Sequence, residues 1–109
     1  MRTFIVGDPA ISTRLLVKYN SRNKFSLFFW DDAGNSIPTS LTDTVVTIEI
    51  DETPGVPTTW TATNAVNAAV FDQAAATVQF TWDTRPFRVV FTKSGLRDVV
   101  MTGEAQVQR

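Results

Sequence analysis

Apolar and polar residues alternate along most of this 109-residue chain. The pattern is clearest where Val46, Ile48 and Ile50 alternate with Thr47 and Glu49. Successive side chains of a β-strand point to opposite sides, so such a run has one apolar face and one polar face. Comparable runs are found at 15–19, 78–82, 87–91, 99–102 and 104–107. The alternation predicts a protein made of strands that each bury one face.

Residues that favour turns separate these runs. The segment 31–35 (Asp-Asp-Ala-Gly-Asn) offers side-chain oxygens and a glycine, and 51–55 (Asp-Glu-Thr-Pro-Gly) places glycine after proline. Ser94 and Gly95 separate the last two long runs. Asp and Asn bond to their own backbone and glycine accepts a positive φ, so each segment is suited to close a hairpin. Turns at this short spacing predict a sandwich or barrel, not βαβ units.

The segment 64–76 has some helical character because it is rich in alanine, which favours helices. Val66, Ala68 and Val70 nevertheless alternate with other residues in the way strands require. We therefore expect strand structure here, with one helical turn near Gln73.

Length and composition fit one domain that spans 1–109. A chain of this length falls within the usual size range of single domains. Its apolar content of 43% is ordinary for a globular protein. We expect an all-β fold, namely a single antiparallel β-sandwich, immunoglobulin-like or jelly-roll-like, of about eight or nine short strands.

Charge and apolar run length narrow the class of function. The net charge is −1 and the basic residues are scattered, whereas nucleic-acid binders present a basic face to the phosphates. No apolar run approaches the roughly 20 residues of a membrane-spanning helix. The first eight residues also lack the apolar region of a signal peptide. We expect a soluble product made in the cytoplasm, with no nucleic-acid or membrane partner.

The side chains that most often carry chemistry are missing, because the chain has no His and no Cys. Asp31 and Asp32 could supply oxygens to Ca²⁺, but their segment lacks the ligand spacing of an EF-hand loop and suits a hairpin turn. Asp72 and Asp83 each follow an aromatic residue, and a glycosidase needs a carboxylate in an apolar setting. Both aspartates, however, lie where strands are expected to end. We therefore expect no enzyme, no catalytic residue, no metal and no cofactor.

Three tryptophans raise the alternative of a carbohydrate-binding module. Trp30, Trp60 and Trp82 could form an aromatic platform for a sugar. Trp82 is in phase with Val78 and Phe80, which predicts a core position. Trp60 is followed by Thr61 and is expected to be half exposed.

The segment 24–30 (Lys-Phe-Ser-Leu-Phe-Phe-Trp) is apolar on both faces. Phe25, Leu27 and Phe29 make one face, and Phe28 and Trp30 make the other apolar as well. Only one face of a sandwich strand meets the core, so the second must be covered by something else. A loop of the same chain and a neighbouring subunit are both possible covers, and exposed aromatics are typical of interfaces.

The order of segments resembles a known family of virion proteins. The relevant segments are 15–17, 25–29, 32–35, 45–50, 60–62, 87–91 and the tail from Gly103 to Arg109. In this order they resemble the small β-sandwich virion proteins of tailed actinobacteriophages, and more distantly the N-terminal domains of phage upper-baseplate proteins. The shared features are an acidic-glycine turn, an amphipathic strand, a tryptophan and a final Gly-x-x-x-Val-x-Arg segment.

The resemblance implies a non-enzymatic structural protein of the phage particle. It implies a minor capsid or head-decoration protein on the capsid surface, with a tail or baseplate component as the alternative. The expected partners are the major capsid protein or tail proteins and further copies of the chain, and the expected location is the virion. We expect the interface to include Phe28, Trp30 and Trp60.

Overall fold

The computed structural model describes residues 4–6, 14–31, 34, 36–52 and 55–109, which form nine β-strands and one short 3₁₀ helix. The elements are β1 (Phe4–Val6), β2 (Arg14–Lys18), β3 (Asn23–Trp30), β4 (Val45–Ile50), β5 (Thr58–Thr61), β6 (Thr63–Ala65), β7 (Ala68–Gln73), η1 (Ala75–Thr77), β8 (Thr84–Lys93) and β9 (Leu96–Gln108).

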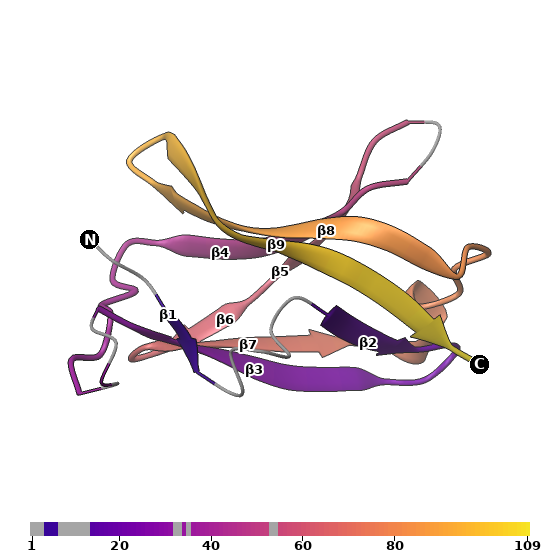
Figure 1. Ribbon diagram of the computed structural model, residues 1–109, viewed down its shortest axis with the longest axis horizontal. Helices are drawn as coiled ribbons and strands as arrows, with labels where there is room; N and C mark the ends of the chain where they lie inside the picture. The colour runs from indigo at the N-terminus through magenta and orange to yellow at the C-terminus, as the bar shows by residue number, and fades with distance from the viewer. Residues whose placement is uncertain (1–3, 7–13, 32–33, 35, 53–54) are drawn as a thin grey trace.

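The strands form two facing sheets, which confirms the all-β sandwich (Figure 1). One sheet has four strands in the order β1-β3-β7-β6, and the other has five in the order β2-β9-β8-β4-β5. The expectation of a wholly antiparallel sandwich is wrong for one pair, because β2 runs parallel to β9. The N-terminal part of the chain forms β1 in the four-stranded sheet and then β2 in the five-stranded sheet. There β2 lies at the edge beside β9 and runs in the same direction as β9.

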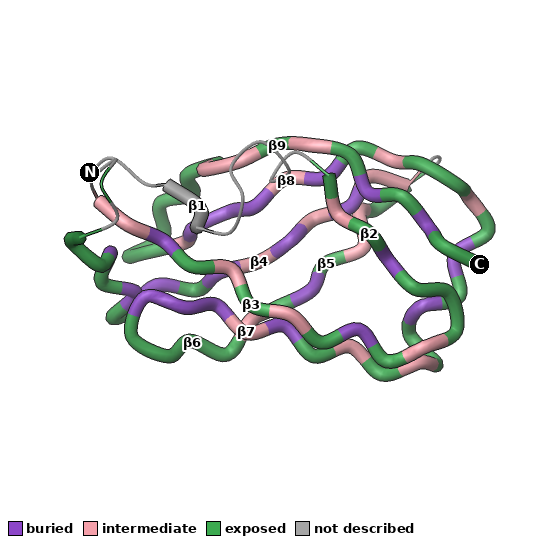
Figure 2. The backbone as a smooth tube through the Cα atoms, turned by 60° about the horizontal axis from the view of Figure 1, so that its bottom comes forward, coloured by how far each residue is buried: buried purple, intermediate pink, exposed green. Residues whose placement is uncertain are grey.

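The core lies between the sheets and follows the predicted alternation. Val46, Ile48 and Ile50 are all fully buried, while the residues between them are not, and Figure 2 shows the same alternation of burial along the strands. Phe29 of β3 meets Phe91 of β8 edge to face, with ring centroids 4.8 Å apart. Since β3 and β8 belong to different sheets, this pair joins the two layers.

A row of aromatic rings fills the core beyond this pair. Phe71 stacks on Phe25 at 5.2 Å, and Phe25 lies 6.4 Å from Trp60. Trp60 lies 6.2 Å from Phe80, which stacks on Trp82 at 4.6 Å. The row begins on β7 and β3, crosses to β5 of the other sheet, and ends on the segment that leads from η1 to β8.

Three expected elements are absent or displaced. The prediction of a hairpin over 31–35 is wrong. β3 and β4 lie in different sheets, so the segment between them crosses from one sheet to the other. Residues 32, 33 and 35 lie outside the described part. The strand expected over 78–82 is also wrong, since this stretch is irregular. Its alternation arises because Val78 and Phe80 both point into the core. The helical turn expected near Gln73 is η1, at Ala75–Thr77.

The β8–β9 hairpin forms as predicted, with Ser94 and Gly95 both at positive φ in its turn. The register of this pair shifts between Val89 and Val90, so that Val89 lies opposite Met101 and Val90 opposite Val99. Val100 is the extra residue of a β-bulge. The prediction that Val99 and Met101 share a face is therefore wrong, because an inserted residue reverses the alternation.

The β6–β7 hairpin turns at a residue that is poorly suited to the position. Val66 has φ = 55° and is 82% exposed. A β-branched residue at positive φ is strained because its Cβ substituents crowd the backbone. The following Asn67 explains why the turn holds, since its Nδ2 donates to the Phe29 carbonyl at 2.9 Å and its own carbonyl accepts from the Phe29 N–H at 3.0 Å.

Val66→Asn should raise the free energy of unfolding by about 1 kcal/mol, because asparagine tolerates positive φ and little packing is lost at an exposed site. Urea unfolding measures the change. Val56→Asn is the matched control, since Val56 is 86% exposed and is not among the described residues at positive φ. The strain assignment fails if the two substitutions change stability equally.

Candidate protein-docking surface

Phe28 is an aromatic residue exposed in the middle of a sheet. It lies on β3 between Leu27 and Phe29, which both pack toward the core, so its ring points to the outer side of the four-stranded sheet. Its ladder partner on β7 is Ala68, whose small side chain leaves the ring uncovered on that side. Phe28 remains 41% exposed. Its position agrees with the prediction of an apolar outer face on β3.

Trp30, two residues further along β3, is half-buried. The connection that leaves β3 folds back beside it, and Pro38 forms an isolated bridge with Trp30. The indole Nε1 is buried and has no hydrogen-bond partner among the described residues. The connection is held in place by Thr39, whose hydroxyl donates to Asp31 Oδ1 at 2.8 Å. Trp30 is thus partly covered by its own chain, and Phe28 is the more accessible of the two.

The prediction that Trp60 belongs to an exposed interface is wrong. Trp60 is only 3% exposed and lies in the middle of the aromatic row of the core. The error came from the threonines around it, which suggested a half-exposed strand but face the solvent on the other side of β5. The sugar platform also fails on this observation. Trp82 is half-buried against Phe80, and its Nε1 donates to Glu52 Oε1 at 2.9 Å.

The outer side of the five-stranded sheet offers a direct comparison with Phe28. Val90 lies on the central strand β8 and, like Phe28, points outward, yet it is only 1% exposed. Arg97 of β9 donates to Glu49 Oε1 of β4 at 2.8 Å, so its side chain crosses β8 between them. Val90 lies on that path, between Arg88 and Thr92 of the same strand.

The same charges form a network on this outer side. Arg88 donates to Glu49 at 2.7 Å and to Asp51 at 2.8 Å, and these hydrogen bonds, Asp51 first, raise the pKa of the Arg88 guanidinium. The Glu49 side chain is mostly buried under the two arginines. The ion pairs of the five-stranded sheet therefore cover Val90, whereas Phe28 on the other sheet has no such cover. Aliphatic residues elsewhere on the outer side of the five-stranded sheet, such as Val45 and Val99, remain exposed.

The outer side of the four-stranded sheet is divided into an apolar and a charged part. Beside Phe28 and Ala68, the neighbouring positions are Ala65 on β6 and Val70 on β7. Toward the other end of the sheet, Arg22 forms a two-bond ion pair with Asp72 at 2.8 and 2.7 Å. The hydrogen bond from Arg22 lowers the pKa of the Asp72 carboxyl, so this exposed pair persists until the pH falls through that lowered pKa.

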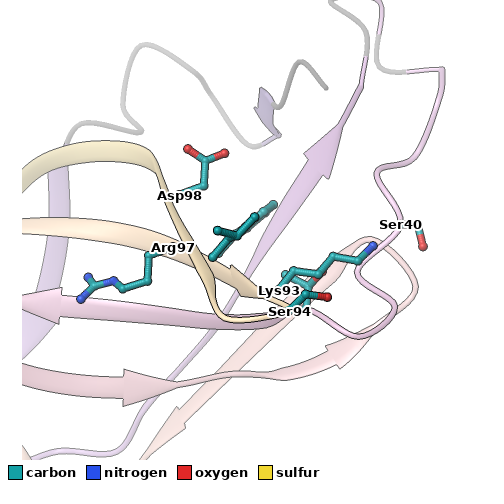
Figure 3. A pocket seen from close by; sticks show the side chains of 8 residues that line it. Ser40, Lys93, Ser94, Arg97 and Asp98 are labelled. Atoms are coloured by element: carbon teal, nitrogen blue, oxygen red, sulfur yellow. The ribbon is translucent and has the colours of Figure 1, made fainter.

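One end of the sandwich carries a groove of about 580 Å³ (Figure 3). It lies between the tip of the β8–β9 hairpin and the β3–β4 connection, with Phe91 and Leu96 as its apolar residues. Lys93 extends toward the side where Ser40 lies, whereas Arg97 points away. The sequence predicts the β8–β9 hairpin but not the groove, because no local pattern indicates that the tip of this hairpin lies opposite the distant β3–β4 connection.

The described residues show no group of three or more carboxylates placed to hold a metal ion. Of the two aspartates proposed for Ca²⁺, Asp31 accepts the hydrogen bond from Thr39, and Asp32 lies outside the described residues. Within the same part of the chain, no helix is long and apolar enough to cross a membrane.

The strand order is that of an immunoglobulin-like sandwich with two additional edge strands, β2 and β5, and not that of a jelly roll. Comparison with known proteins agrees with this fold. A solved structure described as the atomic resolution structure of titin domain M7 superimposes with a TM-score of 0.55 and 12% identity, covering 99% of this chain and 95% of that one. No family model and no curated protein matches the chain. At this identity the likeness shows the fold alone.

Truncation of two adjacent residues of β3 should destabilise the domain to very different extents. Phe29→Ala should lower the free energy of unfolding by about 3–5 kcal/mol, because it empties a fully buried site against Phe91. Phe28→Ala should lower it by less than about 1 kcal/mol, because its ring is largely outside the core. Urea unfolding of both variants checks the register of β3. Equal losses would contradict the orientation described above.

Proposed function

We propose that this chain is a non-enzymatic structural domain that attaches to other protein subunits through the outer side of its four-stranded sheet. The observation that carries the proposal is the 41% exposure of Phe28 near the end of β3, an inner strand of the four-stranded sheet. Aromatic residues are enriched at the centres of protein interfaces, where they contribute much of the binding energy. The exposed apolar residues on the outer side of the other sheet are aliphatic (Leu16, Val45 and Val99), and its central Val90 is covered by charged side chains, so the exposed aromatic supports the choice of this side.

The setting we propose is the particle of a tailed bacteriophage. It follows from the resemblance of segments 25–35, 45–50 and 103–109 to small β-sandwich virion proteins, and the immunoglobulin-like fold is compatible with it. The capsid surface is the first location to test, and the tail or baseplate is the second. The proposed partners are other virion proteins and further copies of this chain.

Multiplicity makes such a role feasible for a small domain. Burying a phenylalanine side chain contributes roughly 1.5–3 kcal/mol, which is too little for a stable contact between two isolated molecules. On a particle surface each copy is held by several weak contacts at once, and these combine through a high effective concentration.

Phe28→Ser should abolish attachment while the domain still folds, because it removes the exposed ring and leaves the core intact. Attachment is measured by co-sedimentation of the purified chain with phage particles that lack it, with heads and tails separated beforehand. Circular dichroism and urea unfolding confirm that the variant folds. Val99→Ser is the control, since Val99 is 49% exposed on the outer side of the other sheet.

Normal attachment of the Phe28→Ser variant would refute the docking surface. Attachment of neither the variant nor the wild-type chain to heads or tails would refute the virion setting. Equal loss in the Phe28→Ser and Val99→Ser variants would mean that any exposed apolar residue matters, and the choice of the four-stranded sheet would be wrong.

A further inference from the structure

A second groove lies between residues of β2 and β3. These two strands belong to different sheets of the sandwich (Figure 1). It has a volume of about 440 Å³, and its floor is formed by Leu15 and Phe25. Both side chains pack against the core yet remain only half-buried. Their incomplete burial marks a place where the sandwich is open between its two sheets.

The groove lies beside an unpaired length of strand. On the side of β3 away from β7, β1 pairs only with Phe28, Phe29 and Trp30, and no described residue pairs with Asn23 to Leu27. The Phe29 N–H donates toward the β7 side, to Asn67. Backbone groups alternate along a strand, so those of Lys24 and Ser26 point to the open side. These four backbone groups have no strand partner among the described residues.

The end of the groove is closed by Asn23. The Lys18 N–H donates to Asn23 Oδ1 at 2.9 Å, and Asn23 Nδ2 donates to the Lys18 carbonyl at 3.0 Å. This side chain therefore ties the end of β2 to the start of β3. An incoming strand can pair with Lys24 and Ser26 but cannot extend past Asn23.

The rims of the groove are positively charged. Lys18 projects from the outer side of β2, Lys24 from the outer side of β3, and Arg22 lies at the closed end. The described residues that line the groove include no carboxylate. Asp72, on the outer side of the sheet, forms the ion pair with Arg22 and is also the cross-strand neighbour of Lys24 on β7. Lys18 is in no ion pair among the described residues.

We propose that this groove binds an extended, acidic segment of a partner protein, which adds as a strand along the open half of β3. Main-chain hydrogen bonds to Lys24 and Ser26 would hold the segment, as in other cases of strand addition to a sheet edge. Alternate side chains would pack on Leu15 and Phe25, and the acidic ones between would meet Lys18 and Lys24. The site is separate from the proposed Phe28 docking surface.

The test titrates the full 109-residue chain with a capped peptide of about seven residues that alternates Glu and Val, a usual strand length. NMR should show the largest shifts at the amides of Lys24 and Ser26. A peptide with N-methyl groups on alternate amides, which keeps its charge but cannot pair along the edge, should bind at least about tenfold more weakly. A peptide that alternates Lys and Val should not bind.

Charge-reversal variants test whether the two lysines at the rims of the groove attract the acidic peptide. The double substitution Lys18→Glu and Lys24→Glu should weaken binding of the acidic peptide by about tenfold or more, whereas Lys93→Glu, at the end of the sandwich, should change it less than about twofold. Phe28→Ser should leave peptide binding unchanged, so that the two sites fail or succeed independently.

Equal binding of the plain and N-methylated peptides would overturn strand addition and leave only charge attraction. Tighter binding of a single-stranded oligonucleotide than of the acidic peptide would overturn the choice of partner. Amide shifts centred away from β2 and β3 would overturn the location.

Discussion

Aromatic packing between the two sheets is the interaction on which the rest of the structure depends. In antibody domains a disulfide joins the strands that correspond to β3 and β8. This chain has no cysteine, and Phe29 and Phe91 meet edge to face between those strands instead. An aromatic pair of this kind adds about 0.5–1.5 kcal/mol to the energy of burial and fixes the register of β3 against β8. A slip of one residue would exchange Phe28 with Phe29 and expose a core ring. The exposed position of Phe28 is therefore a consequence of the core, not of a loosely packed surface.

The division of the N-terminal segment between the two sheets determines the edges of the molecule. β1 covers only the last three residues of β3, and β2 then joins the other sheet beside β9. If a single long strand paired with all of β3, no open edge would remain on that side. The parallel β2–β9 pair extends one sheet, and it leaves the edge of β3 away from β7 without a partner among the described residues over Asn23 to Leu27. The side groove and its unpaired backbone are thus a direct result of the topology.

The sequence is sufficient to predict the class of fold and much of the core, because both depend on local alternation. Val46, Ile48 and Ile50, or Ala105 and Val107, could be assigned to the core from their spacing alone. Features that depend on residues far apart could not be predicted. The crossing between β3 and β4 resembles a hairpin locally, since its turn residues are the same. The bulge at Val100 has no local signature, and one extra residue reverses the faces of Val99 and Met101.

The same distinction, between features set by local sequence and features set by residues far apart, applies to the candidate sites. The two-faced composition of β3 predicts apolar residues on its outer side but leaves open what covers them. Phe28 lies on that side and is 41% exposed, whereas Trp30 is partly covered by the chain's own β3–β4 connection. Trp60 was misplaced because threonines surround it, and only the distant partners Phe25 and Phe80 explain its burial. The side groove could not be anticipated, because Leu15 and Phe25 belong to different sheets and their lysine neighbours look scattered along the sequence. Charge patterning of a surface is a property of the fold, which brings Lys18 and Lys24 to the two rims of one groove.

The energetics of Phe28 limit how this domain can bind a partner. Part of the ring is already buried, so covering the rest contributes roughly 1–2 kcal/mol. Association of two free molecules costs at least about 4 kcal/mol in lost freedom. One ring cannot offset that cost. Contacts through Phe28 therefore require many copies on a common surface, or a second attachment on the same rigid body. The side groove meets the second condition, because β3 presents Phe28 on its outer face and Lys24 and Ser26 along its open edge, and a partner at one position leaves the other free.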